Sequence, residues 1–113
     1  MQLTTYENDD LTTIKILEAR LDAANAPELR AKVHEMIKSG SQRIILDISE
    51  VEFMDSSSLG TMVSILKMVG GSGDLVVAGA KGIVADLFKL TRMDKVFRMT
   101  ADAESAIDVI AAV

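Results

Sequence analysis

A short apolar run that leads through a serine-rich turn into an amphipathic segment constrains the fold of this chain most. Residues 43–48 read Arg-Ile-Ile-Leu-Asp-Ile, a composition typical of a strand in the interior of a sheet. Further on, apolar residues recur at three- and four-residue steps and predict the buried face of a helix: Leu59, Met62, Val63, Leu66 and Val69. A strand followed by a helix that packs back on it indicates an α/β fold, with residues 51–60 at the junction.

The first third of the chain predicts a hairpin followed by a helix. Residues 3–7 and 11–17 are β-prone, and the intervening Asn8-Asp9-Asp10 favours a tight turn. Asn25 is expected to cap a helix by accepting from its free amides, and Gly40 is expected to end that helix. The buried face of this helix is predicted to consist of Leu29, Val33, Met36 and Ile37.

The last third of the chain predicts a further alternation of strand and helix. Residues 70–73, Gly-Gly-Ser-Gly, indicate a turn into a buried strand at residues 74–79. A short helix follows, with a buried face predicted at Ile83, Val84, Leu87 and Phe88. Residues 95–99 favour an edge strand. Asp102 is expected to cap a last helix, which carries Ala106, Ile107 and Ile110.

The composition limits the classes of function. With 113 residues, 49% of them hydrophobic, and no linker-like stretch, we expect one domain that spans residues 1–113. A net charge of −5 with dispersed Lys and Arg residues argues against nucleic-acid binding. No leader-like start and no apolar run of membrane-spanning length are present, so we expect a cytoplasmic protein that does not insert into a membrane.

The serines of the junction lack the partners that a self-contained enzyme requires. A serine nucleophile needs a base, but the single histidine, His34, is predicted on another helix and off its buried face. The Gly-x-Ser-x-Gly elbow is absent as well. The carboxylates Asp47, Glu52 and Asp55 do not have the spacing of a calcium loop. We therefore expect no catalytic residues, no metal and no cofactor.

Residues 55–58, Asp-Ser-Ser-Ser, allow two interpretations. Asp and Ser are preferred N-caps, and one of them suffices to accept from the first amides of the following helix. A cap does not require three consecutive hydroxyls, however. The first turn of a helix carries partial positive charge and therefore also suits an anion.

Three stretches of the chain resemble the STAS domains of bacterial anti-sigma factor antagonists. Residues 51–60 are similar to the family's Asp-Ser-Ser-Gly-Leu-Gly stretch after an apolar strand. Residues 21–29 resemble its loop after the second strand, and residues 87–97 resemble its late helix and strand. The resemblance covers essentially the whole chain. It implies the STAS fold, an α/β domain with a mixed four- to five-stranded sheet and about four helices packed on it.

The resemblance also implies a phosphorylation switch. A partner that is both anti-sigma factor and serine kinase would phosphorylate one serine, a metal-dependent phosphatase would remove the phosphate, and only the unphosphorylated form would bind the partner. By position Ser57 matches the phosphoacceptor, with Ser58 and Ser56 as alternatives, because Ser58 stands where the family usually has glycine. The expected partner contacts are Asp22, Asn25, Asp55, Ser56, Ser58, Leu59, Gly60 and Met62.

Two matters remain open from the sequence. The alternative function is a ligand-binding STAS module, which would bind a nucleotide or a lipid in a sensing or transport assembly. A weak homodimer is also considered.

Overall fold

A mixed five-stranded sheet forms the centre of the described part of the computed structural model, which covers residues 1–8, 10–71 and 73–111. Its strand order is β1-β2-β4-β6-β7. The bounds are Leu3–Asn8 for β1, Leu11–Ile16 for β2, Arg43–Asp47 for β4, Asp74–Ala78 for β6 and Arg98–Thr100 for β7. β1 and β2 are antiparallel, which confirms the predicted hairpin, and the other pairs are parallel. Asp9 and Ser72, both in predicted turns, lie outside the described residues.

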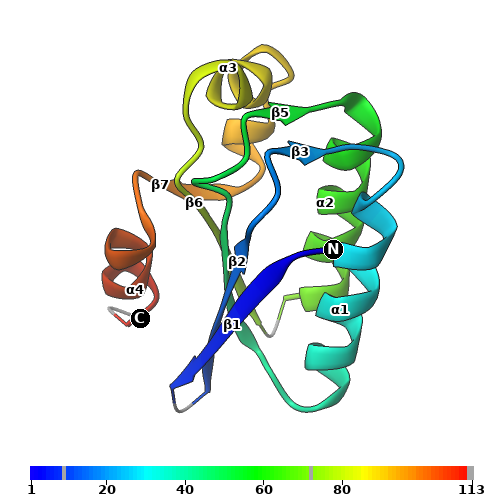
Figure 1. The fold of residues 1–113 in the computed structure, drawn as a ribbon. Coiled ribbons are helices and arrows are strands. Elements are labelled where there is room, and N and C mark those ends of the chain that lie inside the picture. The colour runs from blue at the N-terminus through cyan, green and yellow to red at the C-terminus, as the bar shows by residue number, and fades with distance from the viewer. Residues whose placement is uncertain (9, 72, 112–113) are drawn as a thin grey trace.

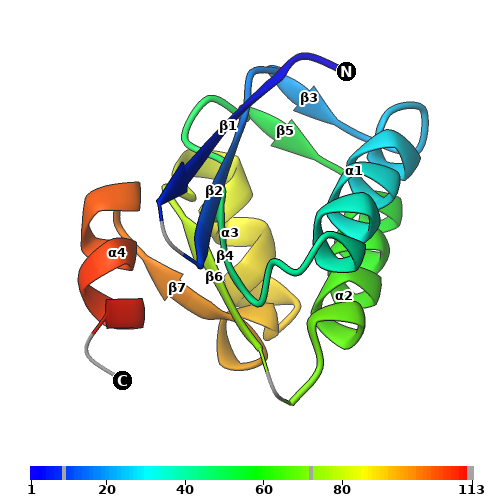
Figure 2. The ribbon, with the colours of Figure 1, turned by 90° about the horizontal axis from the view of Figure 1, so that it is seen from below.

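Helices cover the two faces of this sheet unequally (Figure 1). α1 (Ala26–Lys38), α2 (Ser56–Val69) and α3 (Gly82–Leu90) share one hydrophobic core with the sheet. α4 (Ala103–Ala111) packs on the opposite face, against β4, β6 and β7. α1 and α2 lie side by side in both views (Figures 1 and 2). The predicted mixed sheet with about four helices is confirmed.

The alternation of side chains along the strands divides the interior into two cores. In β4, Ile44 and Leu46 face α1 and α2, whereas Ile45 faces α4 and packs with Val76 and Ala106. All five side chains are fully buried. Strands buried on both faces read as continuous apolar runs, which explains the composition of residues 43–48.

A second, two-stranded sheet positions the segment that precedes α2. β3 (Arg20–Leu21) pairs in parallel with β5 (Phe53–Met54), beyond the carboxyl end of the central sheet. The carbonyl of Ala19 also accepts from the amides of Glu52 and Phe53, at 2.7 and 3.1 Å. These contacts place the loop between β3 and α1 beside the first turn of α2.

Several predicted positions differ in detail from the structure. Ile65, absent from the predicted face of α2, is fully buried, whereas Ile83 and Ile107 are 66% and 43% exposed. Instead of a strand at residues 95–99, a 3-10 helix (Met93–Lys95, η1) precedes a strand that begins at Arg98. None of the helices in the described ranges is both long and apolar enough to cross a membrane.

Candidate functional site

A reciprocal cap forms the start of α2. The carboxylate of Asp55, the N-cap residue, accepts from the amide of Ser58 at 2.9 Å. In return, the Ser58 hydroxyl accepts from the amide of Asp55 at 3.1 Å and donates to its carbonyl at 2.8 Å. This is a capping box in which serine takes the place of the usual Glu or Gln. The predicted capping role of the serine-rich turn is thus confirmed, and it belongs to Asp55 and Ser58.

Three of the expected partner contacts lie inside the protein. Ser58 and Met62 have no exposed surface, and Leu59 is 6% exposed. Leu59 and Met62 belong to the main core, whereas Ser58 is held by the cap. A buried side chain offers little surface for docking, so these three residues are left out of the exposed surface at the helix start. The same burial argues against Ser58 as an alternative phosphoacceptor.

Ser56 and Ser57 present a different surface at the same helix start. Both are exposed, at the first and second positions of α2. Gly60 lies one turn further on, is exposed, and has no neighbouring atom within 4 Å of where a Cβ would stand. Ser56, Ser57 and Gly60 therefore form an exposed part of the helix start made of small side chains.

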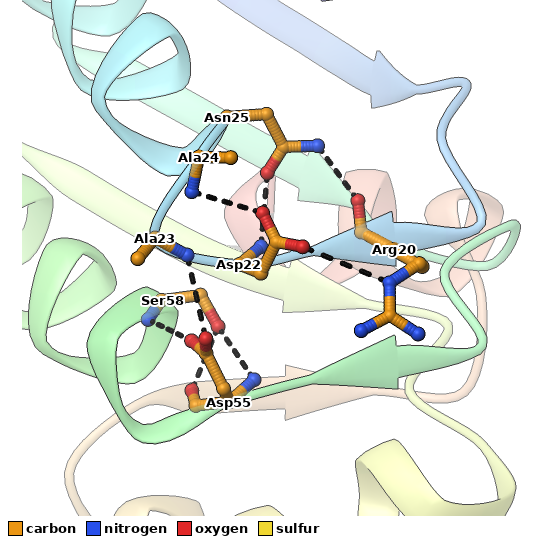
Figure 3. A network of polar contacts seen from close by, with 7 residues as sticks. All are labelled: Arg20, Asp22, Ala23, Ala24, Asn25, Asp55 and Ser58. Atoms are coloured by element: carbon orange, nitrogen blue, oxygen red, sulfur yellow. Dashed lines mark hydrogen bonds and ion pairs between the residues drawn. The ribbon is translucent and has the colours of Figure 1, made fainter.

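The loop between β3 and α1 is fastened to this helix start (Figure 3). The amide of Ala23 donates to the second carboxylate oxygen of Asp55 at 3.3 Å. Within the loop, Asp22 accepts from the amide of Ala24 at 3.0 Å, and Asn25 accepts from the amide of Asp22 at 2.9 Å. Asp22, Asn25 and Asp55, all half-buried, thus come together as the sequence suggested.

The predicted side-chain cap at Asn25 is not formed. Asn25 occupies the N-cap position of α1, but its side chain makes no capping hydrogen bond. Its oxygen accepts from Asp22, and its amide nitrogen donates to the Arg20 carbonyl at 2.8 Å. The side chain therefore braces the loop against β3, a role that depends on a neighbouring strand.

Sequence reasoning overlooked Arg20 and Phe53. The Arg20 guanidinium stacks 4.3 Å above the centre of the Phe53 ring and lies 3.7 Å from the Asp22 carboxylate. Arg20 and Asp22 carry opposite charges and are two residues apart where β3 ends, so their side chains can reach each other. That spacing is the signal that would have found the pair.

The electrostatics of the site are governed by the Asp55 carboxylate. The hydrogen bond from the Ser58 amide lowers the pKa of Asp55 most, desolvation opposes this as the next largest effect, and the bond from the Ala23 amide lowers the pKa further. The group is therefore ionised at neutral pH. An ionised carboxylate beside exposed hydroxyls suits recognition or modification of this surface. His34 is exposed on α1, and in the part of the chain that the structure describes no hydrogen bond or ion pair joins it to these groups. Within the described residues, no three potential ligands gather as a metal site.

Comparisons with known proteins agree on one kind of domain. The model of a family described as STAS domain matches residues 2–106. The chain is 25% identical to the anti-sigma-B factor antagonist of Staphylococcus epidermidis, over 92% of this chain and 96% of the relative.

Two solved structures share the fold at low sequence identity. An anti-sigma factor antagonist from Mycobacterium paratuberculosis is 18% identical, with a TM-score of 0.89 over 97% of this chain and 93% of that one. The Bacillus cell fate determinant SpoIIAA in its phosphorylated form is 20% identical, with a TM-score of 0.72 over 96% of this chain and 99% of that one.

Proposed function

Because the chain belongs to the STAS domain family, as its sequence predicted, we propose that it is an anti-sigma factor antagonist whose docking is switched by phosphorylation of Ser57. The observation that carries the proposal is the exposed Ser57 hydroxyl on a helix start that is tied to the loop between β3 and α1. Unphosphorylated, the chain would bind an anti-sigma factor that is also its serine kinase, and so release the target of that factor. It would act as a binding protein in the cytoplasm and not as an enzyme.

The proposed docking surface consists of the exposed or half-buried residues among the predicted partner contacts, together with the predicted phosphoacceptor Ser57. These are Asp22, Asn25, Asp55, Ser56, Ser57 and Gly60. They come from two segments that the Ala23–Asp55 hydrogen bond holds together. A partner would therefore meet one preformed surface and would not have to order either segment.

Phosphorylation would change the charge of this surface more than its fold. A phosphoserine adds about −1.5 to −2 charge and three acceptor oxygens. The positive end of α2 tolerates that charge, so the domain should remain folded. The surface already carries the Asp22 and Asp55 carboxylates, however, and a partner that fits a neutral hydroxyl would meet repulsion and bulk. A metal-dependent phosphatase would restore the binding form.

Incubation with the organism's anti-sigma-type kinases and ATP, followed by mass spectrometry, tests the modification. Calorimetry then compares the affinity of the partner for the wild type, Ser57→Ala and Ser57→Asp. We expect Ser57→Ala to bind like the unmodified wild type and Ser57→Asp to bind about tenfold more weakly or worse.

A matched control adds one negative charge elsewhere. Gln42 is exposed and precedes β4, at the opposite end of the sheet from Ser57, so Gln42→Glu should leave the affinity unchanged. Equal affinities of Ser57→Ala and Ser57→Asp, or a phosphate found on another residue, would remove the proposed mechanism.

A further inference from the structure

A cavity of about 300 Å³ lies away from the serine-rich turn, beneath α3. It is bounded by α3, by η1, by β7 and by the residues that follow β6 and β7. No residue of α2 lines it. The cavity therefore constitutes a second concave feature that the proposed switch does not use.

The cavity lies at the carboxyl ends of the last two strands of the central sheet and has the volume of a small-molecule pocket. β6 and β7 are parallel, and the cavity opens just beyond their carboxyl ends, at Ala80 and Ala101. Small-molecule pockets have volumes of about 300–1,000 Å³, so this cavity suits a ligand at the small end of the range.

Most of the lining side chains are apolar, and the cavity exists because several of them are too small to fill the space. Ala80, Ala85 and Ala101 contribute only methyl groups, and Met99 adds a flexible apolar wall. Phe88, fully buried, backs the cavity and packs edge-on against Phe97 with ring centres 5.9 Å apart. With Phe88 held in place and Met99 able to change conformation, the cavity can accept an aliphatic or aromatic group.

Thr100, whose hydroxyl donates to the Asp102 carbonyl, and two charges of opposite sign complete the lining. Lys89 comes from α3 and Asp94 from η1. In residues 1–8, 10–71 and 73–111, neither side chain forms an ion pair or a hydrogen bond with another group. A ligand that carries an anion and a cation next to an apolar body would pair with both.

We propose that this cavity binds an α-amino acid with an apolar side chain. Its carboxylate pairs with Lys89, its ammonium pairs with Asp94, and its side chain lies among the alanines and Met99. This inference goes beyond the switch, because it concerns a different ligand at a different place. Either can fail without the other.

A titration of the ¹⁵N-labelled full chain with L-phenylalanine, followed by backbone NMR, tests the assignment. Shifts should cluster at the amides of Ala80, Ala85 and Ala101 and leave Ser57 unmoved. Three probes with the same ring dissect the charges: phenethylamine lacks the carboxylate, 3-phenylpropionate lacks the ammonium, and N-acetylphenylalaninamide lacks both. Exposed ion pairs contribute little each, so the loss of one charge should weaken binding by about two- to fivefold.

Variants assign each charge to its partner. Lys89→Met should reduce the affinity for phenylalanine to that for phenethylamine, and leave the affinity for phenethylamine unchanged. Asp94→Asn should reduce the affinity for phenylalanine to that for 3-phenylpropionate, and leave the affinity for 3-phenylpropionate unchanged. Ala85→Leu should fill the cavity and abolish the clustered shifts, whereas Ile83→Leu, at an exposed position of the same helix, should have no effect.

Ala101→Leu serves as a second filling variant if Ala85→Leu perturbs the spectrum of the free protein. Shifts scattered over the surface, or undiminished binding to a folded filling variant, would overturn the proposal. Equal or tighter binding of N-acetylphenylalaninamide would also overturn it, and would identify the cavity as a pocket for a partner's side chain.

Discussion

Replacement of Ser58 by alanine tests the distinct roles of the three consecutive serines. The Ser58 hydroxyl accepts from the Asp55 amide at 3.1 Å and donates to the Asp55 carbonyl at 2.8 Å. Ser58 is fully buried, so water cannot replace the missing hydroxyl without a rearrangement. Each such hydrogen bond contributes about 0.5–1.5 kcal/mol net, so Ser58→Ala should lower the free energy of unfolding by about 1–3 kcal/mol.

Urea denaturation followed by circular dichroism measures this loss. The midpoint should fall while the slope stays unchanged, because the variant alters the native cap and not the surface exposed on unfolding. For a domain of this size the melting temperature should fall by about 4–12 °C. Ser56→Ala and Ser57→Ala are the matched controls, since both side chains are exposed and both changes should lie within about 0.5 kcal/mol of the wild type.

The functional consequence of Ser58→Ala is equally specific. The variant keeps the Ser57 hydroxyl, so a kinase that modifies Ser57 should still add one phosphate to the folded protein. A stability equal to that of the two controls would refute the reciprocal cap. Loss of the phosphate from folded Ser58→Ala, with retention in Ser57→Ala, would refute the assignment of Ser57.

Three further changes follow from burial, backbone and charge. Gly60→Ala should raise the free energy of unfolding by about 0.5–1 kcal/mol, because the exposed helical position has room for a Cβ. If the partner approaches this backbone closely, the same variant should bind the partner more weakly in calorimetry. Ile65→Ala should lower the free energy of unfolding, measured in urea, by about 2–5 kcal/mol, since Ile65 is fully buried. A smaller loss would show that neighbouring side chains move into the space left by the isoleucine. The lowered pKa of Asp55 means that its ionisation stabilises the fold above the ordinary pKa of about 4, and that this contribution is lost as the pH falls through the lowered pKa. Asp55→Asn should therefore lose less thermal stability than the wild type as the pH is lowered from about 5 into that range, and parallel melting curves would contradict this.

The elements that were predicted correctly are those whose type can be recognised from the residues of the element itself and its immediate neighbours. The hairpin, the strand at residues 43–47 and the helix after residue 55 were all predicted from periodicity and turn residues. The side-chain cap at Asp102 was predicted too, and its carboxylate accepts from the Ser105 amide at 2.7 Å. These features require only neighbours in the chain, so the sequence alone contains the information.

Features that depend on distant segments were missed. β3 and β5 are two residues long, too short for any periodicity, and exist because they pair with each other. The Asp55 carboxylate accepts from the amide of Ala23, 32 residues away, only because the pairing of β3 with β5 brings the two segments together. Ile83 fits the apolar pattern of α3 but is 66% exposed, because no other element covers that side of the helix in the described structure.

The roles of the three consecutive serines could not be distinguished from the sequence either. Ser56, Ser57 and Ser58 are adjacent in the chain, yet successive residues of a helix point about 100° apart. One hydroxyl of such a run can therefore face the cap while the others face solvent. Which one turns inward is decided by the residue that serves as N-cap, and the structure assigns that position to Asp55. Sequence could identify the group of serines but not their division of roles.

The two hydrogen bonds of the Asp55 carboxylate explain why a charge on Ser57, in the first turn of α2, would affect docking more than folding. One oxygen accepts from the Ser58 amide and the other from the Ala23 amide, so a single anion already serves both the helix start and the adjoining loop. A phosphate on Ser57 would not have to replace it in either role. Both segments could keep their places while the negative charge on their shared surface rises. A partner with a closely fitting surface would then be repelled by a domain whose backbone has hardly changed.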